Sequence, residues 1–117
     1  MKFLCLFFFF FALTHTQAQN SSVVQSTVEN ILLGKAANIQ PNLSSGFELH
    51  LRGQVISMAN GPMSKLQAFL NDFPCTSLQI TNPGGNPANG DFRSNSQKFR
   101  LTLYVSGGKL QKMILRE

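Results

Sequence analysis

Few residues of this chain are of the types that perform catalysis or bind metals, and those few are widely spaced. Beyond residue 18 the sequence contains His50, Cys75 and five carboxylates, which are Glu29, Glu48, Asp72, Asp91 and Glu117. A metal site requires clustered His, Cys or carboxylate ligands, and no pair here has the spacing of a ligand motif. Paired carboxylates for hydrolysis would have to come from distant segments. The sequence therefore predicts no catalytic, metal-binding or cofactor-binding residue.

A cysteine–histidine nucleophile pair is the one catalytic arrangement that the residue types still allow. Cys75 with His50 as its base would suit nucleophilic catalysis, but no flanking signature of a cysteine enzyme surrounds either residue. The structural alternatives are an exposed or salt-bridged strand residue for His50, beside Glu48 and Arg52, and a small buried hydrophobe for Cys75. An intermolecular disulfide is a further alternative for Cys75. We expect that the protein is not an enzyme.

The first 18 residues have the features of a cleavable secretory signal peptide. Lys2 supplies a positive charge, residues 3–13 form an unbroken apolar run, and Thr16-Gln17-Ala18 places small residues at −3 and −1 of a cleavage site. An uncleaved membrane anchor is the alternative, but a span of the bilayer takes about 20 apolar residues. We therefore expect a secreted or periplasmic protein with no membrane span after cleavage.

Removal of the signal peptide leaves residues 19–117, which we expect to form a single small α+β domain. Cys75 is then the remaining cysteine, so an intramolecular disulfide cannot form. This excludes disulfide-stapled toxins, growth factors and protease inhibitors. Stability must come from packing of a core that includes five phenylalanines, which are Phe47, Phe69, Phe73, Phe92 and Phe99.

Positive charge is concentrated near the C-terminal end of the chain. Removing Lys2 from the ten Lys and Arg residues leaves nine against five Asp and Glu, a net charge of +4. Five of the nine follow residue 97, interleaved with apolar residues: Lys98, Arg100, Lys109, Lys112 and Arg116. At strand spacing they would form one basic face, either a solvated sheet face or a protected edge. An acidic partner or an anionic envelope surface is the alternative. Nucleic-acid binding would need a denser basic patch or a stacking motif.

Hydrophobic periodicity predicts the secondary structure of the first half. Residues 22–37 carry an apolar stripe at helical spacing, and residues 47–55 alternate apolar and polar side chains as a half-buried strand, with a bend at Gly53. Asn60-Gly61-Pro62 is a helix-start signal, which predicts a helix over residues 62–73. The stripe of the first helix consists of Val24, Val28, Ile31 and Leu32.

The second half is predicted to contain three strands around a long loop. The strands are residues 75–81, 98–105 and 109–116, with a tight turn at Gly107-Gly108 between the last two. Residues 82–97 contain two prolines and several Gly and Asn residues, and are predicted as a turn-rich loop. Long loops in compact domains are typically functional or flexible.

The order of these elements predicts a two-layer α+β sandwich. It runs helix, strand, helix, strand, strand, strand, with a right-handed parallel crossover around the second helix. Each strand has one apolar face, which requires a single sheet covered by helices on one side only. We expect the arrangement of a ferredoxin-like half-domain.

The span from Phe47 to Val105 resembles the periplasmic domains of type IV pilus alignment proteins, of the PilN and PilO kind, and their type II secretion relatives. The matching residues are Arg52-Gly53-Gln54-Val55, Leu66, Phe69, Leu70, Leu78 and Ile80. The resemblance implies a ferredoxin-like fold and a non-catalytic scaffold that acts by homo- or heterodimerisation. Those proteins have a transmembrane helix and a coiled coil, whereas this chain has a short signal segment.

Two functions follow from these observations. The first is an exported, non-catalytic structural or interaction module, part of an envelope or pilus/secretion assembly, with a protein partner. The second is a secreted binding protein or effector that presents residues 82–97 to a ligand. Asn20 and Asn42 begin Asn-X-Ser triplets, which would accept glycans in a eukaryotic source.

Overall fold

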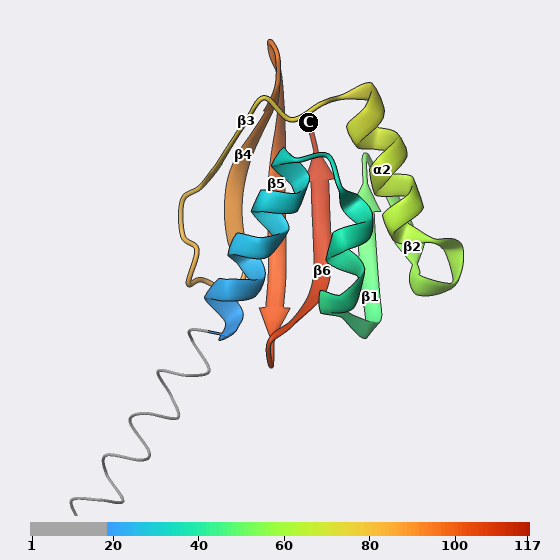
Figure 1. Cartoon of the computed structure of the whole chain (residues 1–117), viewed down its shortest axis with the longest axis vertical. Coiled ribbons are helices and arrows are strands. Elements are labelled where there is room, and N and C mark those ends of the chain that lie inside the picture. The colour runs from blue at the N-terminus through green and yellow to red at the C-terminus, as the bar shows by residue number, and fades with distance from the viewer. Residues whose placement is uncertain (1–18) are drawn as a thin grey trace, which may run out of the picture.

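The computed structural model describes residues 19–117 (Figure 1). The predicted signal peptide, residues 1–18, lies outside the described residues. Residues 19–32 form an N-terminal helix. The remaining elements are η1 (Ala36–Asn42), β1 (Leu43–Leu51), β2 (Gln54–Ser57), η2 (Met58–Asn60), α2 (Pro62–Asp72), β3 (Ser77–Ile80), β4 (Ala88–Ser94), β5 (Gln97–Ser106) and β6 (Lys109–Arg116). Between residues 19 and 117, no helix is long and apolar enough to cross a membrane.

The strands form one six-stranded sheet in the order β2-β1-β6-β5-β4-β3. All neighbouring pairs are antiparallel except β1 and β6, which are parallel. The N-terminal helix, η1 and α2 lie on the same side of the sheet (Figure 1). The predicted two-layer α+β class is therefore confirmed, and within residues 19–117 one sheet face carries no helix.

The ferredoxin-like arrangement is not confirmed, because the predicted crossover does not bring its strands together. The strands before and after α2 are β2 and β3, and they lie at opposite edges of the sheet. The parallel pair is instead β1 with β6, which joins the first strand of the sheet to the last. Local sequence cannot indicate such a distant pairing, since each strand has the same alternating pattern whichever neighbour it takes.

The first predicted strand is in fact a hairpin. β1 begins at Leu43, four residues earlier than predicted, and the chain reverses at Arg52 and Gly53 into β2. Both turn residues have positive φ, 51° and 87°. Gly53 adopts this conformation without steric cost. The predicted bend is therefore a complete reversal, which adds an edge strand to the sheet.

Helix α2 agrees with its prediction. Pro62 occupies the first turn, where its missing N–H costs no helical hydrogen bond, and Gly61 precedes it at φ 62°. The buried side chains recur at helical spacing on the face toward the sheet. They are Met63, Leu66, Phe69 and Leu70, and Pro62 in the first turn is buried as well.

The N-terminal helix agrees with its prediction less well. Val24 and Ile31 are buried, but Leu32 is 43% exposed and the helix ends there. Gly34 has φ 69°, and the chain then forms η1 instead of continuing the helix through residue 37.

Four phenylalanine rings form an aromatic cluster in the core between α2 and the sheet. Phe69 contacts Phe73, Phe92 and Phe99, with ring centroids 5.1 to 5.8 Å apart. Phe92 and Phe99 lie directly opposite each other on β4 and β5 and meet edge to face. Such pairs contribute about 0.5–1.5 kcal/mol each beyond the burial of their area. The cluster therefore fixes α2 against this half of the sheet.

Candidate functional site

Within residues 19–117, the outer face of the sheet, opposite the helices, has no covering layer (Figure 1). Because side chains alternate across a strand, the polar residues of each predicted strand gather on it. One row crosses five strands in direct register: Val55, His50, Ile114, Thr102 and Asn89. Val55 is 57% exposed, and Ile114 is half-buried. The middle of this face therefore combines apolar and neutral polar groups.

The neighbouring row contains an aromatic ring and charged groups. Lys112 lies beside both Glu48 and Tyr104 in register, and its ammonium is 5.4 Å from the centre of the Tyr104 ring. Glu48 and His50 are two residues apart on β1, so they share this face. The His50 Nε2 to Glu48 Oε1 distance is 3.1 Å, and the side chains are 28% and 44% exposed. The interpretation of His50 as a paired strand residue is consistent with this geometry.

At the other end of the outer face, four cations form a group that spans two adjacent cross-strand registers. We call this group the cationic row: Arg93, Lys98, Arg100 and Arg116. Arg93 lies directly opposite Lys98, and Arg100 lies directly opposite Arg116. Directly opposed side chains on antiparallel strands have Cβ atoms about 4.5–5.5 Å apart, where like charges are destabilising. Asp91 lies opposite Arg100 on its other side. The two like-charge pairs therefore work against this arrangement, and Asp91 offsets part of the repulsion at Arg100.

The sequence predicted a basic face here, and the structure refines it. Lys98, Arg100, Lys112 and Arg116 share the outer face, whereas the Lys109 ammonium donates to the Pro41 carbonyl at 3.1 Å. β5 and β6 are interior strands of the sheet, so the protected-edge interpretation is wrong. Arg93 was missed because its segment was predicted as a loop.

Arg52 belongs to a different environment from the cationic row. Its guanidinium forms an ion pair with Glu117 and lies 5.3 Å from the centre of the Phe73 ring. Its backbone N–H donates to the Leu115 carbonyl at 2.9 Å. Arg52 therefore fastens the β1–β2 turn to the end of β6, and its positive charge is already compensated by Glu117.

The helical side of the sheet offers an apolar interior. Among residues 19–117 the buried polar side chains are Thr27 and Ser94, and Thr27 Oγ1 donates to the Val23 carbonyl at 2.7 Å. No group of three or more His, Cys, Asp or Glu side chains in this part of the chain could hold a metal ion. The buried side chains between the layers are therefore mostly apolar.

His50 and Cys75 lie too far apart to act together. His50 is on β1, and Cys75 lies two residues before β3, four strands away in the sheet. At about 4.8 Å per strand spacing, roughly 19 Å separate them. Cys75 packs against the core, and its Sγ donates to the Ser77 carbonyl at 3.4 Å. Burial raises the pKa of the Cys75 thiol, which favours the unreactive protonated form.

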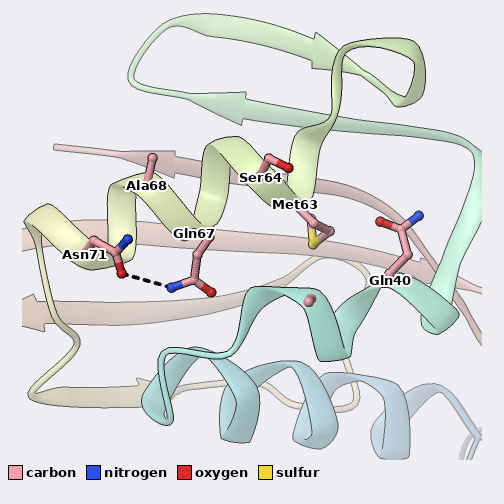
Figure 2. Close-up of a pocket in the computed structure, with 7 residues that line it drawn as sticks. Gln40, Met63, Ser64, Gln67, Ala68 and Asn71 are labelled. Carbon is pink, nitrogen blue, oxygen red and sulfur yellow. Dashed lines mark hydrogen bonds between the residues drawn. The ribbon is translucent and has the colours of Figure 1, made fainter.

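A groove of about 560 Å³ lies between η1 and α2 on the helical side, and Figure 2 shows its lining. Gln67 accepts a hydrogen bond from the Ala36 N–H at 3.1 Å and donates to Asn71 Oδ1 at 3.0 Å. Its amide therefore joins η1 to α2. All lining residues are uncharged, so the groove has no acid, base or ionic anchor.

The predicted loop over residues 82–97 is largely wrong, because residues 88–94 form β4. Ala88 and Phe92 point into the core and are fully buried. The connection that remains is held internally: Asn82 Nδ2 donates to the Pro87 carbonyl at 3.1 Å, and Asn82 Oδ1 accepts from the Asn89 N–H at 2.7 Å. This segment therefore does not present a long ligand-binding loop.

Of the two Asn-X-Ser triplets, the first has a structural role. Asn20 Oδ1 accepts a hydrogen bond from the Gly108 N–H at 2.9 Å, which ties the N-terminal helix to the turn between β5 and β6. Asn42 ends η1, directly before β1.

Comparison with known proteins identifies the fold. No family model and no curated protein matches the sequence. A DUF4783 family protein from Bacteroides uniformis superposes with a TM-score of 0.66 at 9% identity, covering 80% of this chain and 94% of that one. A candidate polyketide cyclase from Xanthomonas campestris gives a TM-score of 0.65 at 13% identity, covering 87% and 92%.

An NTF-2 like protein of unknown function from Burkholderia xenovorans gives 0.60 at 11% identity, covering 86% and 83%. The chain shares the fold of these proteins, with helices on one side of a curved six-stranded sheet. The resemblance to pilus alignment proteins is therefore wrong. Its matching residues, such as Leu66 and Leu78, are positions of core packing that many α+β domains have in common.

Proposed function

We propose that this protein is an exported, non-catalytic interaction module that receives a protein partner on the outer face of its NTF2-like sheet. The observation that carries the proposal is the composition of this face. Along β6 it places Ile114 between Lys112 and Arg116, with Val55 in the same cross-strand row as Ile114 and the Tyr104 ring beside Lys112. Aromatic and apolar groups surrounded by polar ones are typical of protein interfaces.

The non-catalytic part of the proposal draws support from the other side of the sheet. Acid–base catalysis between the layers would require a titratable group directed into that space. Thr27 and Ser94 are the polar side chains buried within residues 19–117, and neither titrates near neutral pH. The groove between η1 and α2 has an uncharged lining. Binding is therefore the function that the described surfaces suit best.

The export part of the proposal rests on the signal-like pattern of residues 1–18. N-terminal sequencing of the exported protein tests it. The expected first residue is Gln19, and a mature protein that retains Lys2 would contradict cleavage.

Site-specific photo-crosslinking tests the interaction surface. The photoreactive residue benzoylphenylalanine would replace Ile114 or Tyr104 on the outer face, and Ala37 or Ser64 beside the helical groove as controls. The protein would be expressed in its own cells, and circular dichroism would confirm that each variant is folded. We expect one discrete cross-linked product from both outer-face positions and none from the controls. Products from the helical positions alone, or from no position, would refute the proposal.

A further inference from the structure

The cationic row has unused binding capacity. Arg93, Lys98, Arg100 and Arg116 are all exposed, and none of their side chains makes a hydrogen bond or ion pair within residues 19–117. Arg52, in contrast, is already paired with Glu117. A sheet that places like charges directly opposite each other accepts a cost in stability. An anionic group bound between two of these cations would attract both of them and offset their mutual repulsion.

The geometry of the row suits such a group. A shallow hollow of about 310 Å³ is lined by Lys98, Arg100 and Arg116, together with Asp91, Phe99 and Glu117. Arg100 and Arg116 approach it from adjacent strands, and each guanidinium has a planar fork that matches a carboxylate. Lys98, two residues before Arg100 on β5, adds a flexible positive charge. The hollow therefore offers two bidentate donors and one point charge beside two carboxylates, of which Glu117 is already paired with Arg52.

The charge of the whole outer face decides against a second copy of this chain as the occupant. The face carries five cations, including Lys112, and two acids, Glu48 and Asp91, a net charge of +3. A two-fold dimer pairs the same surface with itself, so two faces of equal sign would meet. One of the two acids, Glu48, already contacts His50, with 3.1 Å between Glu48 Oε1 and His50 Nε2, so its carboxylate is less available to the cations of a second copy. A partner of opposite charge fits better.

We infer that the partner is a different protein whose contact surface presents carboxylates, and that these bind in the hollow between Arg100 and Arg116. This inference rests on the proposed function, since it specifies the chemistry of the partner on the same face. A continuous anionic surface such as a membrane fits less well, because Asp91 lies within the row and would repel it. Separate carboxylates can be placed on either side of Asp91.

The test uses a fluorescein-labelled octaglutamate peptide as the probe and fluorescence anisotropy as the measurement. We expect binding at low salt, weakening as NaCl screens the charges. The variant Arg100→Glu/Arg116→Glu should lower the affinity by about tenfold or more, which corresponds to about 1.4 kcal/mol. The matched control Lys35→Glu/Lys65→Glu makes the same change of charge at two exposed lysines on the helical side. It should retain most of the affinity.

Three outcomes would overturn the inference. They are no binding of octaglutamate at low salt, an equal loss in both double variants, and binding of phosphatidylglycerol vesicles without binding of octaglutamate. The photo-crosslinking experiment separates this failure from that of the proposed function. If Ile114 and Tyr104 still cross-link a partner while octaglutamate does not bind, the outer face is an interface for a partner that is not acidic.

Discussion

Neutralising one member of each like-charge pair in the cationic row should stabilise the protein. The variant Lys98→Gln/Arg116→Gln removes both opposed pairs but keeps Asp91 beside Arg93 and Arg100. Two unit charges about 7 Å apart in water repel by about 0.6 kcal/mol. For two pairs, the free energy of unfolding should rise by about 1 kcal/mol at low salt.

The assay is thermal unfolding followed by circular dichroism at two ionic strengths. For a domain of this size, 1 kcal/mol shifts Tm by about 4–8 °C. The Debye length falls from about 30 Å at 0.01 M salt to about 3 Å at 1 M, so most of the gain should vanish at high salt.

Lys35→Gln/Lys65→Gln is the control, because it changes the net charge equally at exposed lysines elsewhere. Surface substitutions of this kind usually stay within about 0.5 kcal/mol. An equal gain in the control would mean that net charge is responsible and not the opposed pairs. A gain that persists at high salt, or a loss of stability in the row variant, would refute the electrostatic reasoning.

Three further predictions concern the core and its edge. Phe92→Ala should lower the free energy of unfolding by about 3–5 kcal/mol in urea denaturation, because it removes a fully buried ring of the aromatic cluster; a loss below 1 kcal/mol would contradict the packing. Gly90→Ala should destabilise the protein because an added Cβ would lie 2.9 Å from the backbone carbonyl oxygen of Gln79, which cannot move aside as the Ile80 side chain can, whereas Gly46→Ala meets nothing within 4 Å and serves as the control; equal effects of the two would argue against this contact. Cys75 should react with a thiol reagent more slowly than free cysteine at neutral pH and reach its half-maximal rate at a higher pH, since burial raises its pKa; an accelerated reaction would show that the thiol is activated.

Two patterns were sufficient to predict an element and the face that it buries. They are the alternation of apolar and polar residues in β5 and β6 and the apolar stripe at helical spacing in α2. Phe99, Leu101 and Leu103 are buried as their spacing predicts. The same alternation placed Lys98, Arg100 and Arg116 on one polar face before any neighbouring strand was known. Periodicity was sufficient here because each side chain's direction follows from its own strand.

β4 could not be recognised from its sequence, because its inward residues are mostly small. Ala88, Gly90 and Ser94 give no apolar alternation, and Asn89-Gly90 is the usual signature of a turn. The reason for a glycine lies in the neighbouring strand, where the Ile80 side chain and the Gln79 carbonyl fill the space of a Cβ. Such a requirement exists only once β3 and β4 are paired.

Composition and periodicity alone predicted an α+β protein with a single sheet and a basic polar face. Only the tertiary structure decided that β1 lies beside β6, that Arg93 joins Lys98 in the cationic row, and that His50 lies far from Cys75. The physical reason is that strand pairing is a long-range contact. A strand's own residues specify which face it buries, whereas its partner is chosen by the packing of the whole chain.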